Sequence, residues 1–318
     1  MKHRSFGWFM LILGLVVLVV LGGSVYMLSY ALVPDNNHTR SYNRKYKKLF
    51  AVYPKTKLWH DSLRTADALR DTFVMMDNGE RHHAMYIPAR ERTNRTALVI
   101  HGYTANAVDV MFLGYMYHHD LGFNVLLPDL HAHGKSEGSV VQMGWKERAD
   151  IQRWIAIADS LYRDSTGAAS IVVHGVSMGA ATTMAVSGDS TVASVKCFVE
   201  DCGYSSVWEQ FKGQLEEQFG MPEFPLMYSA SMLCKLLYGW SFGEASALKQ
   251  VRKCRKPMLF IHGDKDKFVP TAMVYDLYEA KSEPKELYIA HGSAHATSYR
   301  DHEKEYTTRV KGFVEKHM

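Results

Sequence analysis

Short apolar runs, separated by turn residues, recur along most of the chain. Runs of this length predict buried strands, and Asn78-Gly79 between the first two predicts a β-hairpin. The chain therefore offers eight strand candidates: residues 72–76, 83–87, 97–100, 123–127, 171–174, 195–199, 257–261 and 286–289.

Helical periodicity fills most of the gaps between these runs. Within residues 145–162, Ile151, Trp154, Ile155 and Ala158 recur at steps of three or four. Residues 271–281 and 298–316 are also amphipathic. Alternation of strands and helices predicts an α/β fold with a mainly parallel eight-stranded sheet and helices on both faces.

One segment interrupts the alternation. Residues 204–250 contain no strand-like run, are rich in aromatic side chains, and are broken by Pro222 and Pro225. We interpret them as a helical cap inserted into a globular domain that spans residues 71–318. The alternative is one ordinary crossover helix with extra core packing.

The N-terminus carries an uncharged, mostly apolar stretch from Ser5 to Pro34. Because about 20 apolar residues cross a bilayer as a helix, residues 1–33 predict a transmembrane signal anchor. Two alternatives remain: a signal peptide cleaved after Ser29-Tyr30-Ala31, and a buried core helix. Residues 34–70 are polar with helical character and are predicted to be a linker.

Charges flank the apolar stretch on both sides. Because long domains translocate largely regardless of flanking charge, we favour a globular domain outside the cytoplasm. A simple count of cations would instead keep that domain inside. Lys2 and Arg4 precede the stretch, and Arg40, Arg44, Lys45, Lys47 and Lys48 follow it.

Composition narrows the class of protein. The 318 residues are 47% hydrophobic and 22% charged, as expected for a globular protein with a large core. The net charge of +4 includes no long basic block, so no nucleic-acid partner is expected. The four cysteines, Cys197, Cys202, Cys234 and Cys254, are too sparse for a disulfide scaffold, although an even count permits a pair.

The clearest chemical motif is Gly175-Val176-Ser177-Met178-Gly179. It follows the strand candidate 171–174 and precedes the helix-like residues 180–185. A strand, a sharp turn and a helix in this order lift a serine hydroxyl above the sheet and direct a helix N-terminus at it. Ser177 is therefore predicted to be a nucleophile.

A serine nucleophile needs a base and an acid that orients the base. Residues 263–270 follow a strand candidate and contain Asp264 and Asp266; Asp264 follows a glycine, where turn capping is the ordinary role, so we favour Asp266. After the last strand, His295 lies in the loop before a helix, and it is preferred over His291 at the strand end.

The tetrahedral intermediate also needs two N–H donors for its oxyanion. One is expected from Met178, directly after the nucleophile, and the other from Tyr103 after His101-Gly102. The alternative is that His101-Gly102 forms only a tight turn.

Taken together, these residues resemble the α/β-hydrolase superfamily, and most of all the bacterial membrane-anchored hydrolases of its serine-aminopeptidase-like and acyl-esterase-like branch. The resemblance covers about residues 70–317 and implies a Ser-Asp-His hydrolase with a cap after the sixth strand. His131 departs from it, because relatives commonly carry arginine there. The motifs are His101-Gly102-Tyr103 and residues 129–138, 175–179, 200–208, 263–270 and 292–295.

The resemblance implies cleavage of esters, thioesters or amides through an acyl-enzyme, with no cofactor and no metal. The expected partners are a small-molecule ester or peptide and, through the N-terminal helix, a membrane. Alternatives are a peptidase or aminopeptidase on the same triad, and a non-enzymatic membrane-tethered binding protein. A metallohydrolase is disfavoured: His131-x-His133 and His291-x-x-x-His295 have ligand-like spacing, but His-Glu-x-x-His is missing from the sequence.

Overall fold

The computed structural model describes residues 2–34, 41–165 and 167–318. Residues 35–40 of the predicted linker, including Arg40, lie outside these ranges. The chain divides into two compact units. We call them the sheet unit, Pro34–Ser205 with Ala247–Met318, and the anchor–cap unit, Met1–Val33 with Ser206–Ser246.

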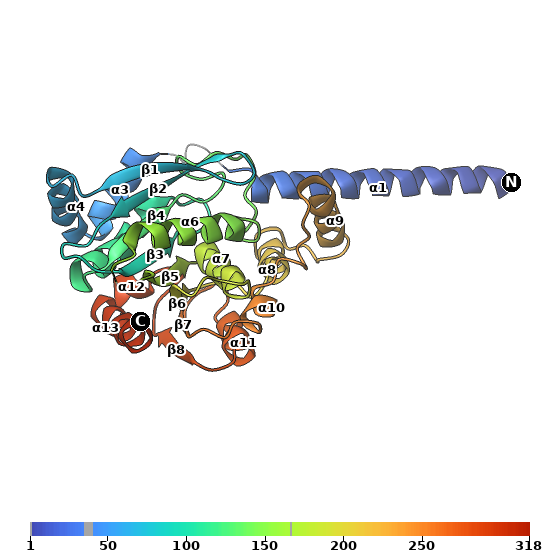
Figure 1. Cartoon of the computed structure of the whole chain (residues 1–318). Helices are drawn as coiled ribbons and strands as arrows, with labels where there is room; N and C mark the ends of the chain where they lie inside the picture. The colour runs from blue at the N-terminus through green and yellow to red at the C-terminus, as the bar shows by residue number, and fades with distance from the viewer. Residues whose placement is uncertain (1, 35–40, 166) are drawn as a thin grey trace. The chain divides into compact units, whose positions relative to one another are not determined.

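An eight-stranded sheet forms the centre of the sheet unit, in the order β1-β2-β4-β3-β5-β6-β7-β8 (Figure 1). The pairings from β4 to β8 are parallel, whereas β1–β2 and β2–β4 are antiparallel. The sequence-based expectation of an eight-stranded, mainly parallel sheet is confirmed, and the sheet is mixed. The strands are β1 Arg70–Met75, β2 Arg81–Ile87, β3 Arg95–Ile100, β4 Asn124–Pro128, β5 Ser170–Val176, β6 Val195–Asp201, β7 Met258–Gly263 and β8 Lys285–Ala290.

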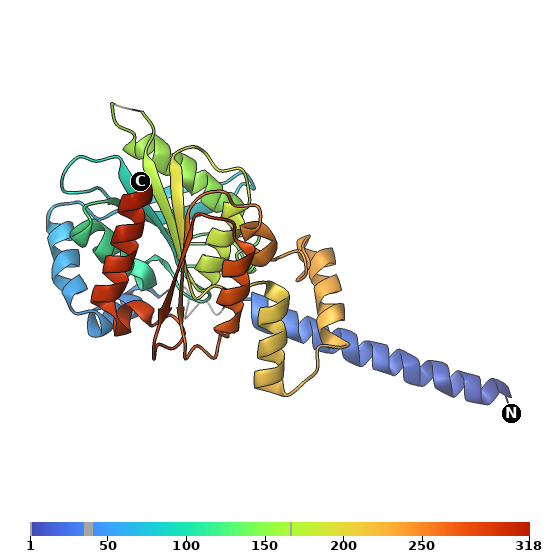
Figure 2. The same ribbon diagram turned by 90° about the horizontal axis from the view of Figure 1, so that it is seen from below.

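Helices cover both faces of the sheet. One face packs against α3, α4, α5 and α13, and the other against α6, α7 and α11, with α10 on α7; Figure 2 shows α13 and α7 on opposite sides of the strands. Their bounds are α3 Tyr42–Val52, α4 Lys55–Thr65, α5 Met111–Tyr115, α6 Glu147–Tyr162, α7 Met178–Ser187, α10 Ala247–Val251, α11 Ala272–Ala280 and α13 Glu303–His317. A 3₁₀ helix, η1 Ala107–Val110, and a π-helical turn, η2 Met116–Asp120, flank α5.

The C-terminal helix shows how spacing sets burial. Tyr306, Val310, Phe313 and Val314 of α13 are buried, and their steps of three and four place them on one face. The single helix expected over residues 298–316 is divided into α12 Ser298–Asp301 and α13. The break lies at His302, whose backbone angles of φ −134° and ψ 44° are not helical.

The anchor–cap unit consists of α1 Lys2–Leu32, α8 Val207–Phe219 and α9 Leu226–Tyr238. Gly220 ends α8 in the left-handed conformation, which glycine adopts readily. The hydroxyls of Ser24 in α1 and Ser229 in α9 are hydrogen-bonded, and Tyr30 donates to Oε1 of Gln218 in α8 at 3.0 Å. The N-terminal helix and the two helices of the predicted cap therefore share one packed unit.

Among the described residues, one helix is long and apolar enough to cross a membrane, over the 27 residues Phe6–Leu32. A signal sequence would meet the same criterion of length and composition. All four cysteines are buried and none of them is in a disulfide, so the pair that their even number permits does not form.

Candidate active site

Ser177 lies at the sharp turn between β5 and α7, at the carboxyl edge of the sheet. Its φ of 58° is in the left-handed region, which serine occupies only under strain. A Cβ on Gly175 would lie 2.0 Å from the carbonyl oxygen of Gly179, and one on Gly179 would lie 2.2 Å from that of Ile100. Both glycines are therefore needed for the turn to close.

The structure brings together the three residues predicted as nucleophile, base and acid. Nε2 of His295 lies 2.8 Å from Oγ of Ser177, and Nδ1 of His295 lies 2.7 Å from Oδ2 of Asp266. An ionised carboxylate can only accept hydrogen bonds, so Nδ1 carries the ring proton and donates it to Asp266. Nε2 is then free to accept the hydroxyl proton of Ser177.

Asp266 is held in one orientation and ionised. Its Oδ1 accepts the backbone N–H groups of Phe268 and Val269, both at 2.9 Å, and its side chain is fully buried. Burial opposes ionisation, but hydrogen bonds from His262 and His295 outweigh it and lower the pKa of Asp266 to about 2. The carboxylate is therefore available to orient His295 throughout the neutral range.

The disfavoured pair, Asp264 and His291, lies apart from this arrangement. Nδ1 of His291 lies 3.0 Å from Oδ2 of Asp264, and Oδ1 of Asp264 accepts the N–H of Gly292 at 2.7 Å. The side chain of His291 is 84% exposed. Asp264 therefore closes the turn after β8, in agreement with its expected local role.

The two residues predicted to donate to an oxyanion, Tyr103 and Met178, lie close to Ser177. Met178 is the first residue of α7, where backbone N–H groups have no partner inside the helix. Tyr103 follows Gly102, on which a Cβ would lie 3.2 Å from Cβ of Ser177. Glycine at this position lets the loop after β3 approach the serine closely.

His101 holds that loop in place. The N–H of Leu130 donates to Nε2 of His101 at 3.0 Å, so Nδ1 carries the ring proton and donates to the carbonyl of Gly102 at 2.8 Å. Burial of the ring lowers the pKa of His101, which keeps it neutral. His101-Gly102 thus does more than turn the chain, a role that the sequence alone did not reveal.

A pocket of about 380 Å³ opens beside Ser177 and His295. One of its walls is helix α3, which lies within residues 34–70, predicted from the sequence to be a polar linker. The sequence does indicate a packed helix here, because Leu49, Val52 and Tyr53 recur at helical spacing. The lining residues from the two sides are Lys45, Lys48, Leu49, Val52, Tyr53, Gly102, Tyr103, Thr104, Ala105, Asp109, Val110, Phe112, Val176, Ser177, His295, Ala296, Thr297 and Arg300.

Lys45 ties α3 to the loop that carries Tyr103. Its Nζ lies 2.7 Å from Oδ2 of Asp109 and donates to the carbonyl of Thr104 at 3.1 Å. Asp109 also accepts the N–H of Asn106 at 2.9 Å and so caps η1. The side chains of Lys45 and Asp109 are only 13% and 19% exposed, which protects the ion pair from solvent screening.

The histidine pairs with ligand-like spacing do not converge. His291 and His295 contact different aspartates, Asp264 and Asp266. Nδ1 of His133 donates a hydrogen bond to the backbone carbonyl of His131 at 2.8 Å, and the ring of His133 packs against that of His101. Neither spacing therefore builds a joint metal site.

Comparisons with known proteins show the family of the chain. A family described as alpha/beta hydrolase fold matches residues 98–225, and one described as serine hydrolase (FSH1) matches residues 165–304. The uncharacterized protein YqkD of Bacillus subtilis (strain 168) is 32% identical over 258 residues, which cover 80% of this chain and 83% of that protein. The uncharacterized protein YfhR of Escherichia coli O157:H7 is 23% identical over 83% of this chain and 86% of its own length.

Solved structures show the same fold. The Pyrococcus furiosus esterase Pf2001 superposes with a TM-score of 0.63 at 21% identity, covering 79% of this chain and 91% of the esterase. A Mycobacterium tuberculosis puromycin-hydrolyzing peptidase gives a TM-score of 0.60 at 18% identity, covering 78% of this chain and 39% of the peptidase.

Proposed function

The chain belongs to the α/β-hydrolase superfamily and is a hydrolase, and we propose that it cleaves carboxylic esters through an acyl-enzyme on Ser177. The observation that carries this proposal is the continuous contact from Asp266 through His295 to Ser177, at 2.7 and 2.8 Å. A base within hydrogen-bond reach of the nucleophile, itself oriented by a carboxylate, is what activation of serine requires.

The proposed reaction has two halves. Oγ of Ser177 attacks the ester carbonyl while Nε2 of His295 takes its proton, and the backbone N–H groups of Tyr103 and Met178 stabilise the oxyanion. The intermediate collapses as His295 returns the proton to the departing alcohol, leaving an acyl-serine. Water, deprotonated by His295, then attacks the acyl carbon, and the proton returns to Oγ as the acid leaves.

The pocket favours acyl groups over free amines. An aminopeptidase needs a carboxylate that is available to the substrate ammonium. Among the described residues that line the pocket the carboxylate is Asp109, and Lys45 already neutralises it at 2.7 Å. Lys48 and Arg300 add positive charge to the rim, which disfavours an ammonium further. Ester cleavage is therefore preferred over aminopeptidase activity on the same triad.

The test uses the full-length chain in detergent. It should hydrolyse p-nitrophenyl esters of increasing acyl length, with a preference for acyl chains that fit the pocket, and should turn over aminoacyl-naphthylamides far more slowly. A fluorophosphonate probe should label Ser177. Faster cleavage of the amides would favour the peptidase alternative. Absence of both labelling and turnover would leave the non-enzymatic, membrane-tethered binding protein.

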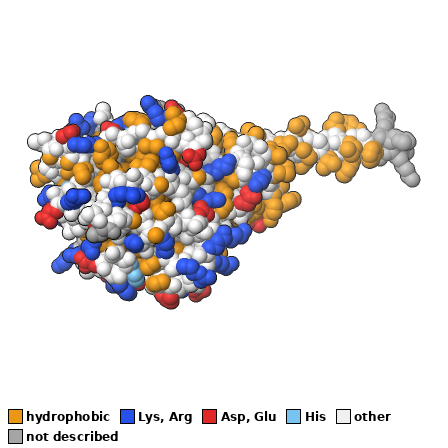
Figure 3. Space-filling view, viewed as in Figure 1, with side chains coloured by type: hydrophobic (Ala, Val, Ile, Leu, Met, Phe, Trp, Pro, Cys, Tyr) orange, Lys and Arg blue, Asp and Glu red, His pale blue; other side chains and the backbone are white. Residues whose placement is uncertain are grey.

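We further propose that the chain is anchored in a membrane through α1, with its sheet unit outside the cytoplasm; the surface of α1 supports the anchoring. Large apolar side chains of α1 are exposed, among them Trp8 at 66% and Leu18 at 67%. Figure 3 shows this apolar surface along the visible side of the helix. A core helix would bury these side chains, so the exposure favours an anchor or a signal sequence over a core helix.

Two measurements test the anchor. Carbonate-washed membranes should retain the full-length chain, and protease added outside intact cells with a permeable envelope should digest the sheet unit. A mature protein that begins near Leu32 would show cleavage instead. Protection from the protease in intact cells, lost on lysis, would reverse the orientation.

A further inference from the structure

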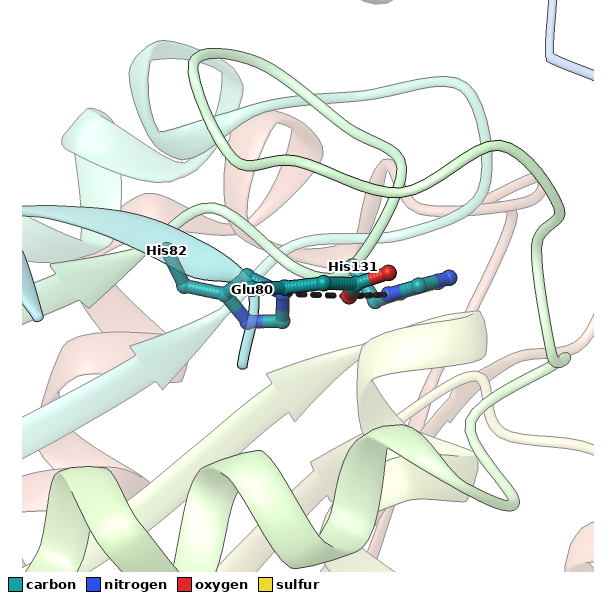
Figure 4. Close-up of side chains that lie close together, drawn as sticks. All are labelled: Glu80, His82 and His131. Carbon is teal, nitrogen blue, oxygen red and sulfur yellow. Dashed lines mark hydrogen bonds and ion pairs between the residues drawn. The ribbon is translucent and has the colours of Figure 1, made fainter. Parts of the chain in front are cut away.

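A second cluster of imidazoles and carboxylates lies in the sheet unit, and the proposed reaction does not use it. Glu80 precedes β2, His82 lies within β2, and His131 follows β4. Oε2 of Glu80 lies 2.7 Å from Nδ1 of His131 and 3.2 Å from Nε2 of His82. Figure 4 shows the carboxylate of Glu80 between the two rings.

Sheet register brings these residues together. β2 and β4 pair antiparallel with Ala84 opposite Pro128, so the chain just before Ala84 lies beside the chain just after Pro128. His82 therefore meets the loop that carries His131. A Cβ on Gly138 would lie 2.6 Å from Cε1 of His131, which shows how closely the loop backbone packs on that ring.

We propose that Glu80, His82 and His131 bind a divalent transition-metal ion of the Zn²⁺ type. The three ligand atoms lie within 4.8 Å of one another, close enough to converge on one ion with small side-chain rotations. Two imidazole nitrogens and one carboxylate oxygen form a ligand set that Zn²⁺ accepts, with a fourth position left for water. The side chains of Glu80 and His131 are 31% and 14% exposed, so an ion can enter from solvent.

The surroundings of His82 give a second, independent argument for a bound ion. Its side chain is fully buried, and its Nδ1 has no hydrogen-bond partner. That Nδ1 lies 3.4 Å from Oδ2 of Asp150 in α6, which is longer than an ordinary N–H···O hydrogen bond. A metal-binding histidine usually donates its second N–H to a carboxylate, which fixes the tautomer and the direction of the ring. Binding of an ion at Nε2 would put the proton on Nδ1 and turn this near-contact into that bond.

The surrounding charge favours a cation. Glu80 and Glu137 bring carboxylates to His82. Burial raises the pKa of the Asp150 carboxyl to about 7, and a cation nearby would favour its ionised form. Asn78 fixes the Glu80 carboxylate by donating Nδ2 to Oε2 at 2.9 Å. The ligand carboxylate is therefore positioned before an ion arrives.

Such an ion would brace the active site without taking part in the reaction. It would join the turn before β2 to the loop after β4. That loop also supplies Leu130, whose N–H holds His101 at 3.0 Å and thereby the loop of the oxyanion donor. The expected effect is on stability.

The experiment uses the full chain in detergent, without a histidine tag, freed of metal with a chelator and then dialysed. Isothermal titration with Zn²⁺ should give one ion per chain. Saturating Zn²⁺ should raise Tm by about 5 °C, and Co²⁺ should give the visible absorption of a four-coordinate site. A chain that binds no Zn²⁺, or gains no stability from it, would overturn the proposal.

Variants locate the ion. His131→Arg can still hydrogen-bond to Glu80 but offers no ligand, and Glu80→Gln keeps the shape of the side chain; each should abolish the Tm rise. Asp150→Asn should weaken Zn²⁺ binding by about 10- to 100-fold. Should His131→Arg fail to fold, Glu80→Gln still decides.

Two controls complete the set. His291→Arg makes the same substitution at an exposed histidine–aspartate pair and should leave Zn²⁺ binding unchanged. His295→Ala addresses the other convergent group, Cys202, Asp266 and His295, and should also retain one ion. Undiminished binding in both His131→Arg and Glu80→Gln, or loss only in His295→Ala, would refute the assignment.

Discussion

Two groups of side chains in the sheet unit combine imidazole rings with carboxylates. In the linear cluster, Asp266, His295 and Ser177 contact one another in a row, and in the Glu80 cluster the rings of His82 and His131 converge on Glu80. In the first, each nitrogen of His295 faces a different partner, Asp266 on one side and Ser177 on the other. In the second, one oxygen of Glu80 faces the two rings of His82 and His131. A linear order gives a proton path from a nucleophile to a base. A convergent order gives a set of ligands.

The carboxylates of the two clusters also differ in burial. The side chain of Asp266 is fully buried and has two backbone N–H donors, whereas that of Glu80 is 31% exposed. A proton path needs fixed geometry, and a metal site needs an opening for the ion. The comparison can be tested by removing members of the linear cluster one at a time.

The largest effect is expected from the nucleophile. Ser177→Ala should lower kcat by about 10⁶-fold, because no other group in the linear cluster can form the acyl-enzyme. Steady-state hydrolysis of a p-nitrophenyl ester measures the loss, and an unchanged Tm would show that the variant is folded. A variant that kept most of its activity would refute Ser177 as the nucleophile.

Loss of the base should be almost as severe. His295→Ala removes the proton acceptor 2.8 Å from Ser177 and should lower kcat by roughly 10⁵- to 10⁶-fold. His291→Ala, four residues earlier and 84% exposed, is the matched control and should keep near-normal turnover. An inactive His291→Ala beside an active His295→Ala would reverse the assignment.

Loss of the orienting acid comes next. Asp266→Asn keeps the shape of the side chain but favours the wrong tautomer of His295, and it should cost up to ~10⁴-fold in kcat. Asp264→Asn in the same loop should cost far less, because Asp264 contacts His291 and Gly292 instead. The reverse ranking would show that the other carboxylate serves the base.

A smaller effect is expected from the tether of α3. Lys45→Met removes the ion pair with Asp109 and the bond to Thr104, and should lower kcat/KM by about 10-fold as the oxyanion loop loosens. Lys48→Met, on the same helix and exposed at the pocket rim, should change kcat/KM by less than about twofold for a neutral ester. Equal effects of the two substitutions would show that positive charge, and not the tether, matters.

The smallest effect concerns stability and pH. The pKa of Asp266 is about 2 in the folded chain, below the value of about 3.9 expected when unfolded. Its ionised form therefore stabilises the fold above about pH 4, and this contribution is lost as pH falls toward 2. Asp266→Asn should lower Tm by a few degrees at pH 7 and by less near pH 3. A difference in Tm that did not shrink with acid would argue against the depressed pKa.

Much of the fold and of the candidate site could be predicted from local sequence patterns. The eight strands and the turn at Ser177 depend on neighbours in the chain, because apolar runs and paired glycines act within a few residues. The pocket wall formed by helix α3 could not be predicted in this way. Leu49 and Val52 line the pocket only because α3 packs against segments that are distant in the sequence. The meeting of Glu80 with His131 depends on the β2–β4 register, and no spacing in the sequence encodes it.

The shared packing of α1 with α9 has a practical consequence for anyone preparing the protein. Tyr228, Met232, Leu236 and Leu237 of α9 are already exposed, by 51% to 73%. A chain shortened to begin after α1 would also uncover the side of α9 that carries Ser229. The shortened protein would then expose a broad hydrophobic surface and self-associate in water. Such aggregation could be mistaken for a folding defect. Full-length protein in detergent is the sample that avoids this artefact.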